Sequence, residues 1–309
     1  MLGEKIKLYR ENKNMTQGEI ADILDVKAAT ISKYEAGTLE PNIESLKKLA
    51  KIFEVSIDEL LKEDDFDISK VNILEVLREQ KKMKLKGNLY HNTQITFAYN
   101  TNHIEGSKLT EDQTRYIYET NTLLAEKDSI TDLDDILETA NHFKLVDYML
   151  DIADKKLTEK MIKEFHKILK EGTSDSRKDW FVVGDYKKLA NEVGGLKTTE
   201  PKNVERDINR LLEWYELLKQ VTINEIIEFH SRFEKIHPFQ DGNGRVGRII
   251  IFKECLKNNI VPFIILDRDK IFYYRGLNEY QRDGEKGYLV DTCLNAQDQY
   301  AKLVEYYLK

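Results

Sequence analysis

The sequence predicts an all-α fold, and three observations lead to that class. Only 4 of the 309 residues are proline, no serine- or glycine-rich tract interrupts the chain, and long stretches repeat apolar residues at helical spacing. A hydrophobic content of 41% can furnish real cores. At this length we expect two domains, or one large domain with an appendage.

Targeting signals and charge narrow the class further. Met1 to Arg10 contains no apolar signal core, and no run approaches the roughly 20 apolar residues that span a bilayer, so we expect a soluble, cytoplasmic chain without a membrane partner. The net charge of -7 argues against broad binding of nucleic acid, but it leaves room for a small DNA-reading surface. Cys255 and Cys293 lack metal-type spacing and are interpreted as reduced core thiols.

The first sixty residues predict a helix-turn-helix. Thr16 is placed to cap a short helix, and Glu19, three residues later, completes a capping box. Asp25 to Lys27 leave room only for a turn, after which Ala28 to Glu35 form a second helix that Gly37 ends. Three further helices are expected, at Leu2 to about Asn12, at about Ile43 to Phe53, and from about Ser56.

This spacing resembles that of the Cro/CI-type repressor domains over about residues 2 to 62. The resemblance rests on Thr16-Gln17, on Ile31 to Glu35, and on Gly37 through Pro41. In that family the second helix of the motif enters the major groove, so the resemblance implies operator DNA as a partner and a homodimer that matches a two-fold operator. It assigns DNA contacts to Gln17, Lys27, Thr30, Ser32 and Lys33. The alternative is a helical bundle whose DNA surface has decayed or now binds protein.

Residues 63 to 86 are expected to join the two domains. The acidic Glu63-Asp64-Asp65 precedes a lysine-rich helix of about Val71 to Lys86, which is interpreted as a spacer. From residue 87 to 309 we expect a second helical domain. Its clearest apolar stripes fall at 133–152, 157–169, 204–218 and 223–233.

One segment breaks the helical pattern. Phe181 to Tyr186 and Val193 to Leu196 are rich in β-branched and aromatic residues, and Gly194-Gly195 fits a tight turn, so a short hairpin is predicted over about residues 181 to 198. Such a hairpin either serves a site outside the core or is a packing flap, and the sequence leaves both open.

The most specific segment runs from His237 to Arg248 and reads His-Pro-Phe-Gln-Asp-Gly-Asn-Gly-Arg-Val-Gly-Arg. Pro238 disfavours the α conformation at His237, so the imidazole should stand exposed at the end of the preceding helix, where it can titrate near neutrality. Phe239 is expected to anchor the loop in the core. These residues predict a general base held at a fixed place.

The second half of this segment predicts a phosphate site. The Gly242-Asn243-Gly244 turn lets backbone amides converge at the start of the next helix, where they form an anion hole. Arg245 and Arg248 project from one face of that helix toward further phosphate oxygens. Asp241 beside such phosphates would carry Mg²⁺.

Two other interpretations of this segment are rejected. Gly242 to Gly247 spells the G-x-G-x-x-G dinucleotide fingerprint, but that fingerprint must follow a strand and open a βαβ unit, whereas here it follows a helix. A plain turn between two helices would not explain why one histidine, one aspartate and two arginines converge.

The segment resembles the Fic family motif, His-Pro-Phe-x-Asp-Gly-Asn-Gly-Arg-x-x-Arg, at every specified position, and the resemblance extends over about residues 85 to 309. It implies a helical Fic-type domain that transfers AMP from ATP to a Ser, Thr or Tyr hydroxyl of a target protein, with Mg²⁺ as cofactor and diphosphate as the leaving group. His237 would take the hydroxyl proton, Asp241 would hold the metal, and the two arginines would grip the β- and γ-phosphates.

The same resemblance makes the hairpin a flap that holds the main chain of the target beside the site. It assigns nucleotide contacts to Val193, Gly194, Gly195, Leu196, Asp241, Gly242, Asn243, Gly244, Arg245, Arg248, Tyr273 and Tyr274. The chain departs from the pattern at Gln281, where some relatives carry an asparagine.

Thr101-Asn102-His103-Ile104-Glu105-Gly106 resembles the inhibitory Ser/Thr-x-x-x-Glu-Gly motif of some Fic proteins. By that resemblance Glu105 pairs with Arg248 and removes the arginine from the γ-phosphate, while Thr101 and Gly106 complete the motif. In such relatives the same glutamate can activate water and strip AMP from a modified protein. A brake and a hydrolytic base both stay open.

Two functions therefore remain after the sequence. One is an autoinhibited, Mg²⁺-dependent protein adenylyltransferase that modifies a target protein and possibly itself. The other is a DNA-binding regulator whose Fic-like domain senses nucleotide or removes AMP. His230, two helical turns before His237, fits a structural role better than a metal pair, since no third ligand is evident.

Overall fold

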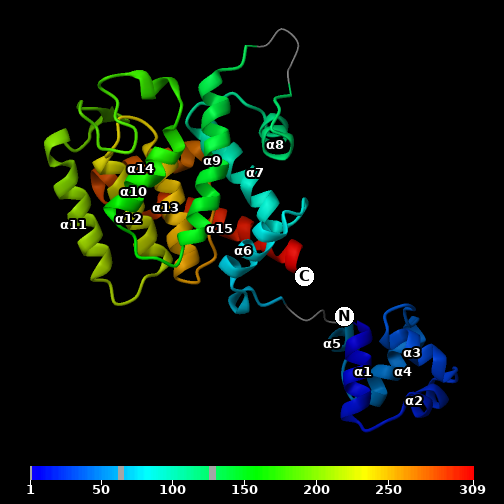
Figure 1. Cartoon of the computed structure of the whole chain (residues 1–309). Coiled ribbons are helices and arrows are strands. Elements are labelled where there is room, and N and C mark those ends of the chain that lie inside the picture. Colours follow the sequence, from blue (N-terminus) through cyan, green and yellow to red (C-terminus); the bar gives the residue numbers. More distant parts are fainter. Residues whose placement is uncertain (1, 62–65, 125–129) are drawn as a thin grey trace. The chain divides into compact units, whose positions relative to one another are not determined.

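The all-α prediction is confirmed by the computed structural model, which describes residues 2–61, 66–124 and 130–309 (Figure 1). The one sheet in the described residues is a two-stranded hairpin. The chain divides into two compact units, with the division between Asp67 and Ile68. The acidic Glu63-Asp64-Asp65 lies outside the described residues. Within the described part of the chain, no helix is long and apolar enough to cross a membrane.

The first unit contains five helices: α1 (Leu2–Asn12), α2 (Gln17–Leu24), α3 (Ala28–Glu35), α4 (Ile43–Phe53) and α5 (Ile57–Leu61). The predicted capping box is present, because the Thr16 hydroxyl accepts from the Glu19 amide and the Glu19 carboxylate accepts from the Thr16 amide. Asp25 adopts a left-handed conformation with φ 58°, which ends α2 and turns the chain into α3. Ile20 and Ile31, one on each helix, are fully buried in a shared core.

The second unit begins with α6 (Ile73–Met83), α7 (Leu89–Ile104), α8 (Glu111–Thr120), α9 (Leu133–Ile152) and α10 (Glu159–Lys170). The predicted spacer helix differs from expectation here, since α6 packs against α7 and α9 as part of this unit. Its apolar stripe buries Leu74 and Leu77, and the Arg78 guanidinium donates to the Leu150 carbonyl at 2.8 Å. The lysines of α6 therefore lie on its solvent-facing side, and its apolar side packs against α7 and α9.

The remaining helices are α11 (Val204–Glu216), α12 (Ile223–Ile236), α13 (Asn243–Lys257), α14 (Lys270–Asp283) and α15 (Gly287–Leu308). Short 3-10 helices lie at Ile68–Lys70, Ser174–Arg177, Pro201–Asn203 and Asp267–Asp269. Almost every residue of α13 is buried, and it packs against α7, α9, α10 and α12. A helix that is covered on all sides can fix its N-terminus rigidly, and that N-terminus carries the conspicuous motif.

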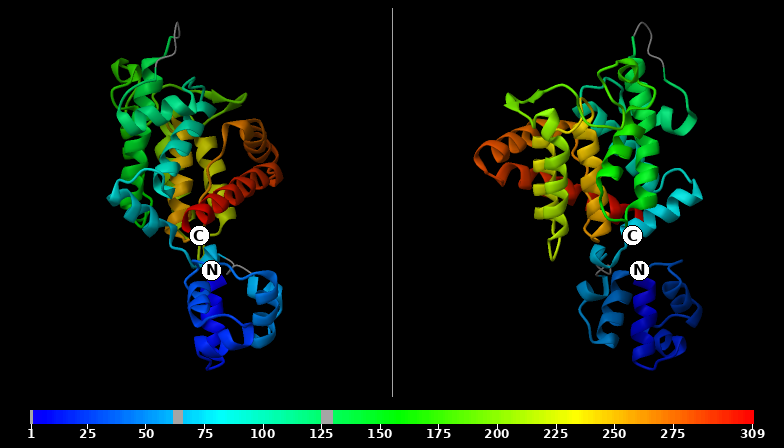
Figure 2. Two further views of the ribbon diagram at one scale, coloured as in Figure 1. Left: turned by 90° about the vertical axis from the view of Figure 1, so that its right-hand side faces the viewer. Right: turned by 60° about the vertical axis from the view of Figure 1, so that its left-hand side comes forward.

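The hairpin consists of β1 (Glu192–Val193) and β2 (Leu196–Lys197), antiparallel with Val193 opposite Leu196. Gly194 and Gly195 both have positive φ, 57° and 74°, as the tight turn requires. It extends beside α14, where the Asn278 amide lies 3.4 Å from the Gly194 carbonyl (Figure 2). The hairpin is shorter than predicted, because Phe181 to Tyr186 form turns rather than a strand.

Candidate functional site

His237 stands at the junction of α12 and the motif loop. It ends α12 in the left-handed conformation, with φ 51°, and its N–H donates to the Phe233 carbonyl at 2.9 Å. As expected, His237 does not adopt the right-handed helical conformation that the following Pro238 disfavours. It adopts the left-handed conformation instead. Left-handed backbone costs a non-glycine residue about 1–2 kcal/mol, which the surrounding contacts offset.

Ring stacking and side-chain hydrogen bonds hold the loop after His237 in place. Phe239 is fully buried, as predicted, and stacks on the His166 ring at 4.0 Å. The Asn243 side chain accepts from the Phe239 amide at 2.7 Å and donates to the Phe239 carbonyl at 2.9 Å. Asn243 thus closes the loop with its side chain, whereas the sequence assigned it to the anion hole.

His166 had no role in the sequence interpretation, yet it supports the same loop. Its Nδ1 accepts from the Gly184 amide at 2.9 Å, so Nε2 carries the proton and donates to the Asp241 carbonyl at 3.2 Å. Burial lowers the pKa of His166 to about 3, which keeps this tautomer neutral. The helix α10 therefore links the turn at Gly184 to the motif loop.

The imidazole of His237 is less exposed than the sequence predicted. Its side chain is 15% exposed, and burial, followed by the charge of Lys187, lowers its pKa to about 4. The expectation that it titrates near neutrality is wrong, because burial and the charge of Lys187 disfavour the imidazolium. At neutral pH the ring is uncharged and keeps a free nitrogen lone pair, as a general base requires.

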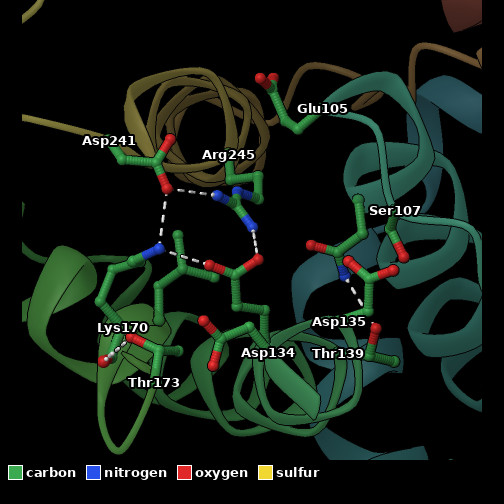
Figure 3. Close-up of polar contacts among 12 residues, drawn as sticks. Glu105, Ser107, Asp134, Asp135, Thr139, Lys170, Thr173, Asp241 and Arg245 are labelled. Atoms are coloured by element: carbon green, nitrogen blue, oxygen red, sulfur yellow. Dashed lines mark hydrogen bonds and ion pairs between the residues drawn. The ribbon is translucent and has the colours of Figure 1, made fainter. Parts of the chain in front are cut away.

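Asp241 is held by two cations on the other side of the loop. Its Oδ2 lies 2.7 Å from Lys170 Nζ and 3.1 Å from Arg245 Nη2 (Figure 3). Burial alone would raise the pKa of this carboxyl, but Arg245 and Lys170 hold the pKa of Asp241 well below its usual range. The side chain remains 51% exposed, and it is ionised throughout the physiological range.

The two arginines of the motif point to different partners. Arg245 is buried and pairs with Glu138 of α9 as well as with Asp241. Arg248 is also buried, and its guanidinium donates to the Thr101 hydroxyl at 2.6 Å, to the Thr101 carbonyl at 3.0 Å and to the Glu105 carboxylate at 2.6 Å. Thr101 and Glu105, from the end of α7, thus hold the second arginine.

The Glu105 carboxylate lies against the N-terminus of α13. A Cβ at Gly244 would overlap it, so the glycine is what allows the approach. Gly106, with φ 104°, lets the chain leave α7 directly after Glu105. The carboxylate therefore occupies the place at a helix N-terminus where an anion is favoured.

A pocket of about 460 Å³ joins these elements. It is lined by Glu105, Val193, Gly194, Leu196, Glu234, His237, Gly244, Arg248, Tyr273, Tyr274, Leu277, Asn278 and Gln281. This volume is in the range that small-molecule ligands occupy. Several residues assigned to the nucleotide are not part of the lining: Gly195, Asp241, Gly242, Asn243 and Arg245.

The wall formed by α14 contains both tyrosines that the sequence selected. Tyr273 is buried and its hydroxyl lies 2.6 Å from His230 Nε2, while Tyr274 is 42% exposed and donates to the Ile104 carbonyl at 3.2 Å. His230 is therefore a hydrogen-bonded core residue. Leu277 and Asn278, one helical turn further along α14, also line the pocket. No sequence motif had identified them as site residues.

A divalent cation fits this site only with help from a substrate. No cluster of three or more His, Cys, Asp or Glu side chains that could hold a metal occurs among the described residues. Asp241 offers a half-exposed, ionised carboxylate, and Mg²⁺ commonly binds through one protein carboxylate together with phosphate oxygens and water. The donor set thus suits Mg²⁺ that arrives with a polyphosphate.

Of the side chains expected to contact DNA, most are exposed and one already has a partner within the helix-turn-helix unit. Lys27, Ser32 and Lys33 are exposed, and Thr30 is half-buried. Gln17 donates to the Glu35 carboxylate at 2.8 Å, so in the unbound protein its amide is already engaged.

The fold and the site together define a two-domain class: a helix-turn-helix unit followed by a helical unit whose pocket combines an imidazole, an arginine and a helix N-terminus. The sequence profile of the Fic/DOC family matches residues 156–254, and that of the helix-turn-helix family matches residues 6–60. The chain is a Fic/DOC-domain protein with an N-terminal helix-turn-helix domain.

Two relatives are similar in sequence, and one solved structure is similar in fold. A protein adenylyltransferase Fic from Nematostella vectensis is 29% identical over 185 residues, 59% of this chain and 42% of that protein. The HTH-type transcriptional activator BcrR from Enterococcus faecalis is 50% identical over 58 residues, 19% of this chain and 28% of that protein. The fold resembles a Fic domain containing signaling protein from Bacteroides thetaiotaomicron, with TM-score 0.56, 24% identity and coverage of 76% and 91% of the two chains. The chain thus spans less than half the length of these two curated relatives.

Proposed function

We propose that this protein transfers AMP from ATP to a hydroxyl side chain of a protein, and that Glu105 restrains the reaction. The observation that carries the proposal is the pocket in which His237, Arg248 and the N-terminus of α13 come together. A neutral imidazole beside an anion site is the arrangement that proton abstraction next to a polyphosphate needs. The kinship with protein adenylyltransferases supports the same reaction.

In the proposed reaction His237 accepts the proton of the target hydroxyl, whose oxygen bonds to the α-phosphorus while the bond to the diphosphate breaks. The amides at the start of α13 and the guanidinium of Arg248 stabilise the negative charge on the phosphate oxygens. Asp241 would hold Mg²⁺, which neutralises phosphate charge when it is bound. Tyr273 and Tyr274 line the side of the pocket that we assign to the nucleoside.

The hairpin is proposed to receive the target. Val193 lies on β1, is 41% exposed and lines the pocket, so a polypeptide added along the hairpin would carry its hydroxyl toward His237. Gly194 allows the turn of the hairpin to lie close to α14.

Glu105 is proposed as the brake because it takes both features that a γ-phosphate would need. It pairs with Arg248, and it occupies the space next to Gly244. A charge-assisted hydrogen bond contributes about 1.5–3 kcal/mol, so its removal is expected to raise transfer by about tenfold or more. The same carboxylate, if it turned toward a bound water, would serve as the base that removes AMP from a modified protein.

Labelling with α-³²P ATP and Mg²⁺ tests the transferase. Wild type, Glu105→Gly, and Glu105→Gly with His237→Ala are compared, and all three must bind ATP. Label that appears with Glu105→Gly and disappears with His237→Ala supports transfer, brake and base together. Absence of label from all three, with ATP bound, contradicts the proposal. Incubation of AMP-modified protein with wild type, followed by measurement of free AMP, tests the reverse role of Glu105.

A second function is proposed for the first unit, which is DNA binding by α3. Lys27, Ser32 and Lys33 are exposed on or next to this helix, and the unit is related to a transcriptional activator. Gln17 would exchange its bond with Glu35 for a contact to DNA. Lys33→Ala with Thr30→Ala should abolish specific retention of operator fragments and leave AMP transfer intact, whereas His237→Ala should do the reverse. Loss of both activities in either variant contradicts independent functions.

A further inference from the structure

A buried carboxyl group lies beside the proposed base. Glu234 precedes His237 by one turn of α12, lines the pocket and is 8% exposed. Its Oε2 is 3.9 Å from His237 Nδ1. Its Oε1 has no hydrogen-bond partner among the described residues, and neither has His230 Nδ1. His237 Nδ1 has no partner at ordinary hydrogen-bond distance, but the backbone of Glu234 lies close enough to the ring to raise the pKa of His237. Three polar atoms with unsatisfied hydrogen-bonding capacity thus gather on one face of α12.

Gly247 of the motif makes the room for this group. A Cβ at Gly247 would lie 2.5 Å from Glu234 Oε1 and 2.9 Å from His230 Cε1. His230 in turn is fixed from its other nitrogen by the Tyr273 hydroxyl at 2.6 Å. A row of polar groups therefore runs through the core and ends at the proposed base. It consists of Tyr273, His230, Glu234 and His237.

The electrostatics of the row suit a group that faces an imidazole. Burial raises the pKa of Glu234 to about 8, Arg248 opposes this rise, and Glu105 adds to it. At neutral pH the carboxyl is mostly protonated and uncharged, so it does not fix a costly buried charge.

We propose that Glu234 is a positioning residue for His237, which holds Nδ1 of the imidazole so that Nε2 faces the target hydroxyl. Nδ1 is buried, so the exposed edge of the ring that lines the pocket carries Nε2. In the reaction the hydroxyl proton goes to Nε2, and the Nδ1 proton stays between His237 and Glu234. The 3.9 Å separation shortens when substrate is bound, as catalytic hydrogen bonds often do. This inference rests on the proposed role of His237.

Kinetics in the Glu105→Gly background test the inference. Glu234→Leu removes both oxygens, Glu234→Gln keeps an acceptor of the same shape, and Glu228→Leu is the matched control. Glu228 lies on the same helix but pairs with Arg232 and Lys286 and does not line the pocket. We expect Glu234→Leu to lower kcat about 10–100-fold with the KM for ATP within about twofold, and Glu234→Gln to restore most of the loss.

Two kinetic outcomes would overturn the proposal. One is a kcat of Glu234→Leu equal to that of the parent. The other is a loss in Glu228→Leu as large as that in Glu234→Leu, which would make the effect one of stability. Gly247→Ala gives a separate check, since its Cβ displaces the Glu234 carboxyl without removing it, and it should lower kcat in the same direction.

A measurement without turnover separates this inference from the proposed function. The ¹⁵N shifts of the His237 ring, assigned by their loss in His237→Ala, report which nitrogen carries the proton. We expect Nδ1 to carry it in the wild type at neutral pH, and the population to move toward Nε2 in Glu234→Leu. An unchanged population in folded Glu234→Leu refutes the positioning role. If the Glu105→Gly parent transfers no label, the proposed function fails, and the ring shifts still decide the role of Glu234.

Discussion

Lys170 provides the sharpest test of the energetics around the motif. Its side chain is 2% exposed, and its ammonium lies 2.7 Å from Asp241 (Figure 3). The same ammonium lies 2.5 Å from Glu138 and 2.6 Å from Asp175. Lys170→Met keeps the length of the side chain and removes the charge. Since the three carboxylates come from α9, from the segment after α10 and from the motif loop, their repulsion then acts across the whole site.

The expected loss follows from the burial of these groups. Removal of one partner from a buried ion pair costs about 3–5 kcal/mol, because the other charge stays desolvated. Arg245 still neutralises Glu138 and Asp241, and Lys178 still pairs with Asp175 at 2.5 Å, so the lower end of about 3 kcal/mol is expected. For a unit of this size that is a fall in Tm of about 6–12 °C.

Lys178→Met is the control, since it removes a cation from the same Asp175. Lys178 is 44% exposed and has no contact with Asp241, so its loss should cost less than about 1 kcal/mol. Scanning calorimetry and urea unfolding of the full chain at pH 7 measure both variants. Equal losses for the two lysines, or a change below about 2 °C for Lys170→Met, would refute the argument from burial.

Three further predictions concern single side chains. Burial lowers the pKa of His142 to about 3, below its unfolded value near 6.5, so the stability that is present above pH 6.5 is lost as the pH falls. Between pH 7.5 and 5.5, urea unfolding should show that wild type loses about 1.4 kcal/mol more than His142→Phe. Equal losses in the two proteins would contradict this prediction. Asn243→Ala leaves the Phe239 amide and carbonyl without partners and should cost about 2 kcal/mol in the same assay; an unchanged midpoint would assign Asn243 to ligand binding alone. Thr16→Ala removes the N-cap of α2 and should cost about 1 kcal/mol in unfolding of the first unit, measured by circular dichroism against a Thr16→Ser control that keeps the cap.

Local signals made the helix boundaries predictable from sequence. Thr16 and Glu19 specify the start of α2 by bonds that span three residues, and Gly194-Gly195 specifies the turn of the hairpin by its conformation. The motif itself predicted a helix start at about Gly244, and α13 begins at Asn243, because Gly242 permits the left-handed conformation that precedes the helix.

The partners of the motif could not be predicted in the same way. Glu138 and Lys170 lie 107 and 71 residues from the groups they bind, Arg245 and Asp241, and no local pattern distinguishes them from solvated helix residues. The protonation of His237 also escaped prediction, because its pKa depends on burial by the folded chain rather than on its neighbours in sequence. For the same reason the sequence did not indicate that Glu234, a charged residue in an amphipathic helix, is buried.

Thr101 and Glu105 both accept hydrogen bonds from Arg248, but only Glu105 brings a negative charge. Thr101 accepts two of the three hydrogen bonds of the guanidinium, through its hydroxyl and its carbonyl, and Glu105 accepts the third. If Glu105 leaves, Arg248 loses its counter-ion but keeps the two bonds that orient it. Because Glu105 lies at the C-terminal end of α7, where a carboxylate is disfavoured, and against the N-terminal end of α13, where it is favoured, the two helix dipoles partly cancel and its release costs less than that of a fully buried pair. Under the proposed function, Thr101 would therefore hold Arg248 in place for a phosphate, and only Glu105 would have to move for the pocket to accept a γ-phosphate.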